Sequence, residues 1–361
     1  MFGKKCDWKK CRNLSVILGL LSLCIMTLIA VYATGWKEDN LKWVDDFDVL
    51  DETKWQHVVS GNRGYDNEFQ YFRRDKRNSY VTNGALHLKA TLVGDEVSDS
   101  EVRGGLQDLP GCNEEPCVVR GDPEGDCILP VYSAQLHTKQ LFRIKSGRVE
   151  VRARFPSGDW LRPEIALLHS TDGSEEAAEI RIAEGCGNKY ISDPDGHSLG
   201  ADTVGQGIRR STANLTDRAQ KTLWTTTLPA GYFSDAFHVF EAEWTPGHII
   251  FRVDGTETGR LVPPGGGPWE LGPFTLNIPE FLSSWSVGTA MAPFDREFYL
   301  VVKLSVGGSY FEDQLENLNY PKPWNSSGGR PVTDFYENSP YYAPTWDRPE
   351  LEIDYVRIYQ H

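Results

Sequence analysis

The body of the chain is a series of short, strand-like segments separated by turns. Thirty-four glycines and 21 prolines interrupt stretches that are rich in β-branched and aromatic residues. Thr245-Pro246-Gly247 lies between two such stretches and predicts a hairpin. Many short strands with frequent turn signals are typical of an all-β sandwich or barrel. The clearest predicted strands are residues 147–155, 237–244, 248–253, 298–306 and 351–359.

The same part of the chain gives no sign of a second domain. All-β folds often reach roughly 200–250 residues as one domain, so a chain of 361 residues need not be divided. No internal repeat or shift in composition divides residues 40–361, and the only weak helix signal lies at 211–221. We therefore expect one large domain over residues 35–361. Two long stretches rich in Gly, Asp and Ser, 95–128 and 192–229, are expected to be loops that wall a groove.

The N-terminus differs sharply from this body. Residues 1–13 contain five basic residues and one acidic residue, and residues 14–33 form an uncharged apolar run. Twenty apolar residues are enough to span a membrane, and the preceding positive charge predicts a cytoplasmic N-terminus. We expect a transmembrane signal anchor of a single-pass type II protein, with the domain on the extracellular or lumenal side. A secretory signal peptide cleaved near Val31-Tyr32-Ala33 is the alternative, and the protein would then be secreted.

The net charge limits the partners of the domain. The chain carries a formal charge of −14 although its first 13 residues are basic, so the rest is more acidic still. Nucleic acids and anionic lipids are recognised by clustered Lys and Arg, which this composition opposes. We expect no nucleic-acid partner, and a neutral polysaccharide remains open.

Cysteines and glycosylation motifs fit an oxidising compartment. Asn214-Leu-Thr216 and Asn325-Ser-Ser327 match the N-glycosylation pattern. The closely spaced Cys112, Cys117 and Cys127 suggest at least one local disulfide in a loop, while pairing with Cys186 is left open. The cysteine spacing is not that of a zinc site, and we expect no metal-binding residues there.

Residues 178–188 contain two glutamates and an arginine at a suggestive spacing. On a regular strand Glu179 and Arg181 share one face and Glu184 points to the other. A β-bulge between Ile182 and Glu184 would return Glu184 to the face of Glu179. Retaining glycosidases use two carboxyl groups about 5–5.5 Å apart, one as nucleophile and one as acid/base. The spacing alone also fits a solvated strand face with alternating charges.

Short motifs recur in a characteristic order along residues 43–359. They are Asp46-Phe-Asp48, Trp55-Gln-His57, Asn67-Glu-Phe-Gln-Tyr71, Ser133-Ala-Gln-Leu136, Gly147 to Arg154, Gly158-Asp-Trp160, Glu243-Trp-Thr-Pro246, Ala292-Pro-Phe-Asp295 and Asp354-Tyr-Val-Arg-Ile358. Together they resemble glycoside hydrolase family 16, in its laminarinase-like branch, and the invertebrate β-1,3-glucan recognition proteins, also called Gram-negative bacteria-binding proteins. The resemblance implies a concanavalin A-like β-jelly-roll sandwich with a concave glucan-binding cleft.

The resemblance assigns roles to the two glutamates and reveals departures around them. Active members carry Glu-Ile-Asp-Ile-x-Glu, so Glu179 matches the nucleophile and Glu184 the acid/base. The Asp between them is Arg181 here. Two tryptophans of the active pattern are replaced by Arg162 and Ala166. A cleft histidine of the family aligns with Arg209.

These departures favour binding over hydrolysis. A nearby guanidinium stabilises a charged carboxylate, which suits a nucleophile but harms an acid that must hold a proton. The first hypothesis is therefore a β-1,3-glucan-binding or recognition protein with weak or no hydrolysis. An active retaining endo-β-1,3-glucanase that uses Glu179 and Glu184 is the alternative. A structural or adhesion role without glycans is a third.

Sugar contacts are expected from aromatic residues and from the central arginine. Trp160 and Trp285 can stack on sugar rings, and Arg181 can bind substrate, although core packing is the alternative for both tryptophans. The loop from Tyr341 to Trp346 is a further aromatic candidate. We expect no cofactor. The sequence has no EF-hand-like loop that would predict a Ca2+ site, and a structural Ca2+ is left open. The sequence names no protein partner.

Overall fold

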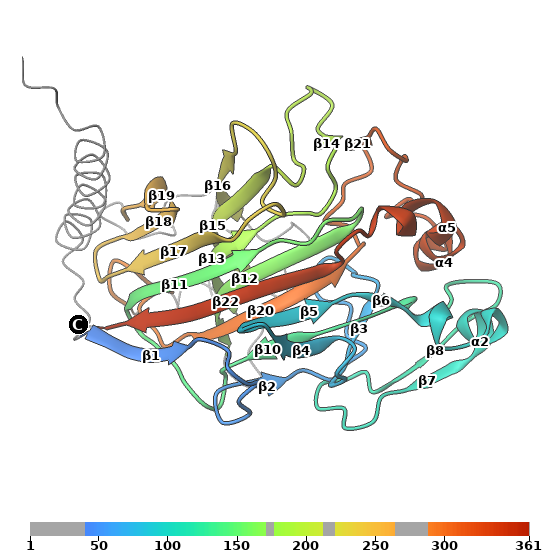
Figure 1. Ribbon diagram of the computed structural model, residues 1–361, viewed down its shortest axis with the longest axis horizontal. Coiled ribbons are helices and arrows are strands. Elements are labelled where there is room, and N and C mark those ends of the chain that lie inside the picture. Colours follow the sequence, from blue (N-terminus) through green and yellow to red (C-terminus); the bar gives the residue numbers. More distant parts are fainter. Residues whose placement is uncertain (1–39, 171–176, 212–220, 264–287, 361) are drawn as a thin grey trace, which may run out of the picture.

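Two large antiparallel β-sheets pack face to face and form most of the molecule (Figure 1). The computed structural model describes residues 40–170, 177–211, 221–263 and 288–360. Valine, leucine, isoleucine and aromatic side chains from both sheets form one shared hydrophobic core. The prediction of an all-β sandwich is confirmed.

The first sheet has eight strands. Its order is β19-β18-β17-β11-β22-β5-β4, and β1 pairs with β22 beside this path. Side chains of β11 alternate between buried and half-buried, so that Val149, Val151 and Ala153 face the core. The strands are β19 (Thr256–Leu261), β18 (Ile249–Val253), β17 (His238–Trp244), β11 (Gly147–Arg154), β22 (Glu350–Tyr359), β5 (Ala85–Lys89), β4 (Ser79–Thr82) and β1 (Leu41–Asp45).

The second sheet has seven strands and carries the residues of interest. Its order is β16-β15-β13-β12-β20-β10-β2. Ile165 and Leu167 of β12 and Ile180 and Ile182 of β13 are fully buried on the face toward the core. The strands are β16 (Lys221–Thr227), β15 (Thr203–Ser211), β13 (Ala177–Glu184), β12 (Leu161–Ser170), β20 (Tyr299–Val306), β10 (Gln135–His137) and β2 (Gln56–His57).

Smaller elements lie at the margins of the sandwich. β3 pairs in parallel with β9, which also pairs with β6, and two-stranded ribbons are formed by β7 with β8 and by β14 with β21. The strands are β3 (Gln70–Phe72), β6 (Thr91–Leu92), β7 (Leu106–Asp108), β8 (Val118–Arg120), β9 (Val131–Ser133), β14 (Ile191–Ser192) and β21 (Glu316–Asn317). The helices are η2 (Val93–Asp95), α2 (Asp99–Gly104), α4 (Pro331–Glu337), α5 (Ser339–Tyr342) and η4 (Ala343–Thr345).

The five predicted strands are confirmed as β11, β17, β18, β20 and β22, and β17 and β18 form the predicted hairpin. The prediction that residues 192–229 form a loop is wrong over much of its length, because β15 and β16 belong to the second sheet. Gly205 and Gly207 weaken the strand signal of β15. A side chain at Gly205 would meet Glu184 of the neighbouring strand at 3.2 Å, which explains the small residue there. The other expected loop, 95–128, contains α2 and the β7–β8 ribbon.

The predicted local disulfide is confirmed and joins Cys112 to Cys117. Cys127 and Cys186 are buried free thiols. Among the described residues, no helix is long and apolar enough to cross a membrane. The expected signal anchor at 14–33 lies outside these residues, and so does Trp285.

Candidate functional site

A β-bulge in β13 gathers the predicted catalytic residues on one face of the second sheet. Glu179 pairs with Arg209 and Arg181 with Gly207, but the next partner of β15, Gly205, pairs with Glu184. Three steps along β13 therefore match two along β15. The bulge predicted between Ile182 and Glu184 is confirmed, and it brings Glu184 to the face of Glu179 and Arg181.

Neighbouring strands and one loop add further charged side chains to this face. Glu164 of β12 lies between two neighbouring strands and pairs with Glu184 of β13 on one side and Lys303 of β20 on the other. The loop between β2 and β3 contributes Asp66 and Glu68, which reach Arg162 of β12. We call the resulting group the ion cluster. Within the described part of the chain it comprises Asp66, Glu68, Arg162, Glu164, Glu179, Arg181, Glu184, Lys303 and Arg209.

Arg181 is the central cation of the ion cluster. Its Nε and Nη2 each lie 2.6 Å from Oε1 of Glu179, and its Nη1 forms an ion pair with Glu184. Nη2 also lies 3.7 Å from Oε1 of Glu164. The Arg181 side chain is only 1% exposed. The arginine that replaces the family's aspartate therefore binds both of the residues expected to do the chemistry.

Arg162 forms a second centre beside it. Its guanidinium lies 2.6 Å from Asp66, 3.2 Å from Glu184 and 3.4 Å from Glu164. It also packs over the ring of Tyr310, 3.9 Å from the ring centroid. Glu184 is thus held by two arginines, and its side chain is 2% exposed.

Opposite charges shift the pKa values of three members of the ion cluster toward their charged forms. Burial alone would raise the pKa of Glu164, but Arg162, Lys303 and Arg181 together outweigh it and hold that pKa well below its usual range. The pKa of Asp66 is likewise lowered, because Arg162 and Arg209 overcome the effect of burial. Burial disfavours the cationic form of Lys303, yet Glu164 and Glu68 raise its pKa. Opposite charges, rather than shared protons, therefore hold these groups together.

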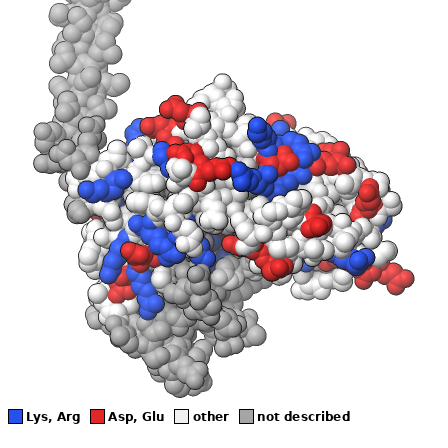
Figure 2. Space-filling model, turned by 90° about the horizontal axis from the view of Figure 1, so that it is seen from below, with Lys and Arg blue, Asp and Glu red and all other residues white. Residues whose placement is uncertain are grey.

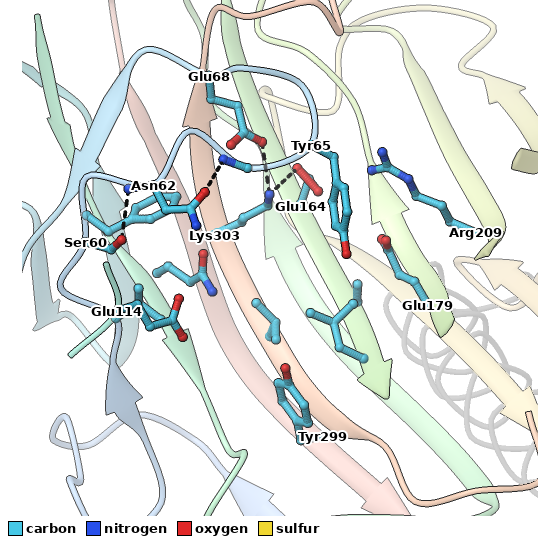
Figure 3. A pocket seen from close by; sticks show the side chains of 17 residues that line it. Ser60, Asn62, Tyr65, Glu68, Glu114, Glu164, Glu179, Arg209, Tyr299 and Lys303 are labelled. Atoms are coloured by element: carbon cyan, nitrogen blue, oxygen red, sulfur yellow. Dashed lines mark hydrogen bonds and ion pairs between the residues drawn. The ribbon is translucent and has the colours of Figure 1, made fainter. Parts of the chain in front are cut away.

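A cavity of about 420 Å³ opens on this face of the second sheet (Figure 3). Its floor is apolar, and its walls carry charged and polar side chains. Arg209 lies at one wall, where the exposed Tyr65 covers its guanidinium at 4.6 Å from the ring centroid. The lining residues are Val58, Ser60, Asn62, Gly64, Tyr65, Glu68, Phe72, Glu114, Gln135, Glu164, Ala166, Leu168, Glu179, Arg209, Tyr299, Val301 and Lys303.

The predicted site residues divide between the cavity and the interior. Glu179 lines the cavity, whereas Arg181 and Glu184 do not and are almost fully buried. The structure therefore brings all three together but leaves only Glu179 facing a ligand. A general acid must reach the glycosidic oxygen, and Glu184 is turned toward Arg162 and Arg181 instead. The expectation that Arg181 contacts substrate directly does not fit this position, because its side chain is buried and does not line the cavity.

Trp160 lies in the hydrophobic core and has no exposed ring face for a sugar. Its exposure is 0%, and its ring meets Phe311 and Trp324 edge-on at centroid distances of 5.3 and 5.1 Å. The expectation that Trp160 stacks on substrate is corrected to core packing. In the Tyr341–Trp346 segment, Tyr341 is exposed but does not line the cavity.

Sequence reasoning did not single out Tyr65, Glu68, Glu164 or Lys303. Two of them had a visible signal. Glu68 lies inside the motif Asn67–Tyr71, and Lys303 is the one charged residue in the apolar strand β20. Glu164 precedes the apolar run Ile165–Leu168 of β12, which is a weaker signal of the same kind, and Tyr65 has no such signal.

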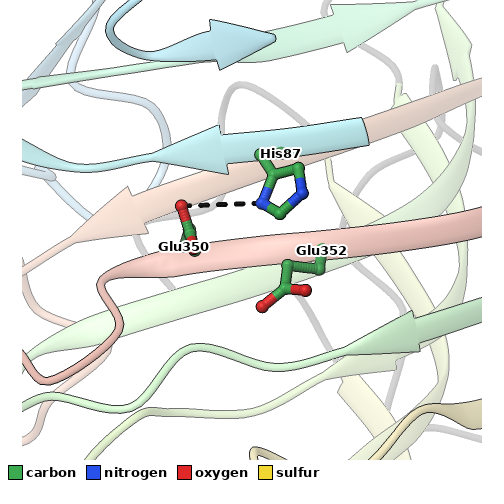
Figure 4. Close-up of side chains that lie close together, drawn as sticks. All are labelled: His87, Glu350 and Glu352. Atoms are coloured by element: carbon green, nitrogen blue, oxygen red, sulfur yellow. Dashed lines mark ion pairs between the residues drawn. The ribbon is translucent and has the colours of Figure 1, made fainter. Parts of the chain in front are cut away.

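Two groups among the described residues have ligand atoms close enough to hold a metal ion, and neither lies at the cavity. His87, Glu350 and Glu352 meet on the first sheet, where His87 Nδ1 is 3.6 Å from Glu350 (Figure 4). The carboxylate of Glu352 is already bound by Arg154, at 2.5 and 2.6 Å, and this positive charge opposes a metal cation. The other group, Asp193, Asp195 and His197, lies on a surface loop.

On the face drawn in Figure 2, basic and acidic side chains lie next to one another. Outside the grey atoms, no broad area of only positive charge appears on that face.

Comparisons with solved structures identify the fold. A laminarinase from Rhodothermus marinus matches with a TM-score of 0.53 and 24% identity, over 89% of this chain and 97% of that one. SCLam, a non-specific endo-β-1,3(4)-glucanase of family GH16, matches with a TM-score of 0.53 and 21% identity, over 91% and 93%. Similarity at these identities concerns the fold alone. The sandwich is that of the family 16 laminarinases.

Sequence comparisons identify the relatives. No family model matches the chain. A β-1,3-glucan-binding protein of Penaeus monodon is 31% identical over 341 residues, which cover 88% of this chain and 89% of that protein. Gram-negative bacteria-binding protein 1 of Drosophila melanogaster is 28% identical over 89% of this chain, and a β-1,3-glucan-binding protein of Tenebrio molitor is 31% identical over 87%. The match spans 64% of each of these two insect proteins. The chain belongs to the family of β-1,3-glucan-binding and Gram-negative bacteria-binding proteins.

Proposed function

We propose that this protein binds β-1,3-glucan in the cavity of the second sheet and hydrolyses it weakly or not at all. The observation that carries the proposal is the position of Arg181 between Glu179 and Glu184. The chain belongs to a family of β-1,3-glucan-binding proteins and has a cavity on this face, while the two carboxylates needed for hydrolysis are bound to a buried guanidinium.

The absence of efficient hydrolysis follows from what each step needs. A retaining mechanism requires one carboxylate that attacks the anomeric carbon and one carboxylic acid that protonates the leaving oxygen. Glu179 faces the cavity, but its Oε1 is 2.6 Å from two nitrogens of Arg181. Glu184 is 2% exposed and is paired with two arginines. Neither group is free to act on a substrate in this arrangement.

Binding is supported by the composition of the cavity. Its volume falls within the usual range of roughly 300–1,000 Å³ for ligand sites. Charged side chains at the walls can form charge-assisted hydrogen bonds with sugar hydroxyls, and the apolar floor with Tyr299 can contact the faces of sugar rings. The acidic body does not oppose a neutral polysaccharide.

We further propose that the domain works outside the cell, attached through residues 14–33 or released after cleavage near Val31–Ala33. The disulfide between Cys112 and Cys117 supports an oxidising compartment. Asn325 is exposed, as glycosylation of its sequon requires. A structural Ca2+ and any protein partner lie beyond this proposal.

The test combines a binding assay with a hydrolysis assay on the full chain. We expect calorimetry to detect binding of laminarin but not of dextran, and we expect little or no release of reducing ends. Arg209→Ala, at the cavity wall, should weaken laminarin binding, whereas Arg260→Ala should not. Arg260 is an exposed arginine whose ion pair with Glu257 lies away from the cavity.

Two results would count against the proposal. If the full chain fails to bind laminarin, the binding function is wrong. If reducing ends are released rapidly and Glu179→Gln abolishes this turnover, the protein is instead an active retaining glucanase.

A further inference from the structure

The loop closed by the Cys112–Cys117 disulfide, residues 112–117, forms part of the cavity wall. We call it the disulfide loop. The two cysteines are five positions apart, and their Cα atoms are 5.5 Å apart. Glu114, near the middle of the loop, lines the cavity. A loop closed over so few residues loses much of its conformational freedom.

Hydrogen bonds fix the disulfide loop against the chain segment that follows β2. The backbone N–H of Asn113 donates to the carbonyl of Val59 at 3.1 Å, and the N–H of Gly61 donates to the carbonyl of Pro116 at 2.9 Å. The side chain of Asn113 makes two more bonds: it accepts from the N–H of Val59 at 2.9 Å and donates to the carbonyl of His57 at 2.8 Å. These four hydrogen bonds hold the loop against residues 57–61.

This attachment determines where Glu114 lies. The segment that holds the loop contributes Val58, Ser60 and Asn62 to the cavity, so the loop and its support form one wall. In Figure 3 Glu114 lies on the side of the cavity opposite Glu179 and Arg209. Gly61 has little room for a side chain, because a Cβ atom there would lie 2.7 Å from the side chain of Val119 and 3.1 Å from the carbonyl oxygen of Pro116 in the disulfide loop. The close approach of the loop to this segment is thus built into the sequence.

Glu114 differs from the other carboxylates of the cavity. Glu68, Glu164 and Glu179 are all engaged by cations of the ion cluster. Glu114, in contrast, is exposed to solvent, and its side chain makes no hydrogen bond or ion pair with any of the described residues, although the charge of Lys139 acts on its carboxyl group. Its two oxygens remain free to accept hydrogen bonds from a ligand. A carboxylate at a cavity wall that makes no hydrogen bond within the described part of the chain can accept hydrogen bonds from the hydroxyl groups of a sugar.

We propose that Glu114 is a ligand-binding residue that selects for hydroxyl-rich sugars from the wall opposite Glu179, and that the Cys112–Cys117 disulfide holds it in place. This inference rests on the proposed glucan-binding function. It adds a second wall to the site, contributed by a loop rather than by the sheet that carries the ion cluster.

The first experiment measures laminarin affinity of the full chain and of variants by calorimetry. Glu114→Ala removes both acceptors and is expected to weaken binding by about ten- to a hundredfold, the usual effect of one hydrogen bond to a charged group. Glu114→Gln keeps one acceptor and should weaken binding less. The matched control is Glu115→Gln, a neighbour with the same charge that does not line the cavity and accepts a bond from the N–H of Cys117. This control should bind as the wild type does.

The outcomes separate this inference from the proposed function. If the wild type binds laminarin and Glu114→Ala binds equally well, the inference is wrong while the proposed function stands. If Glu115→Gln loses as much affinity as Glu114→Ala, the effect is one of charge and the inference is again wrong. If the wild type does not bind laminarin at all, both this inference and the proposed function are wrong.

The second experiment tests the disulfide. We expect a reductant to weaken laminarin binding of the wild type several-fold and to leave a Cys112→Ser/Cys117→Ser double variant unchanged, because that variant has no such bond to lose. Unfolding midpoints measured in parallel show that the domain remains folded. Thiol titration first shows that the reductant has opened the disulfide. If the wild type then binds laminarin with unchanged affinity, the positioning role of the disulfide is refuted.

Discussion

Replacing Arg181 by methionine removes the cation that lies among Glu164, Glu179 and Glu184. Within the described residues the ion cluster contains five carboxylates and four cations, and the substitution leaves three cations. Methionine fills much of the same volume, so the main loss is electrostatic. Removing one partner of a buried ion pair costs about 3–5 kcal/mol, because the remaining charge is left uncompensated.

This cost can be converted into a melting temperature. Unfolding entropy near 60 °C is about 2.1 cal/mol/K per residue, which gives about 0.7 kcal/mol/K for a domain of roughly 320 residues. A loss of about 4 kcal/mol in the free energy of unfolding therefore lowers Tm by about 6 °C. Differential scanning calorimetry at pH 7 measures this directly.

The control and the double variant make the argument specific. Arg260→Met deletes an exposed arginine whose side chain is 46% exposed and whose partner Glu257 is also exposed, so Tm should change by less than about 2 °C. Adding Glu184→Gln to Arg181→Met should recover part of the loss, because one uncompensated carboxylate disappears. The reasoning is refuted if Arg181→Met melts within 1 °C of the wild type, or if Arg260→Met is equally damaging.

Two further predictions concern pH and have opposite signs. The pKa of Glu164 is lowered in the folded protein, so its stabilising contribution is present above about pH 4.3 and is lost as the pH falls. Glu164→Gln should therefore lower the urea midpoint at pH 7, and the difference between this variant and the wild type should shrink toward pH 3. A difference that stays constant with pH would contradict this account. Burial raises the pKa of Asp159 to about 6, and the hydrogen bond from Asn317 and the charge of Lys189 oppose this only in part. This group therefore destabilises the fold as the pH rises through 6. Asp159→Asn should raise the free energy of unfolding at pH 7.5, by at most about 3 kcal/mol, and should have little effect at pH 3.5; equal effects at both pH values would rule this explanation out.

The sequence predicted the architecture and the centre of the site for identifiable reasons. Alternating strands such as β11 have one buried face, and this periodicity is visible in the residues themselves. The spacing of Glu179, Arg181 and Glu184 required a bulge if the three were to share a face, and the bulge is present. The alignment of Arg209 with a cleft residue agrees with its position at the cavity wall.

The rest of the site depends on contacts between distant parts of the chain. Arg162 binds Asp66, which precedes it by 96 residues, and Lys303 binds Glu68 across 235 residues. No local pattern records such pairs. Trp160 was wrongly assigned to the ligand for a related reason. Its indole faces the core because it packs against Phe311 and Trp324, which come from a later segment of the chain. The strand β15 was not predicted because Gly205, which makes room for Glu184, and Gly207 weaken the strand pattern of its sequence.

Ala166 and Arg181 are direct cross-strand neighbours on the cavity face, and this pairing restricts how the site can change. Neighbours of this kind have Cβ atoms only about 5 Å apart, so they share one volume. A tryptophan at position 166 would compete with the guanidinium for that volume, and an aspartate at position 181 would leave it empty beside the small alanine. The two positions are therefore epistatic: each substitution toward the hydrolytic pattern is costly while the other is missing. A mutational route from this sequence to the hydrolytic pattern at the two positions has to change both together.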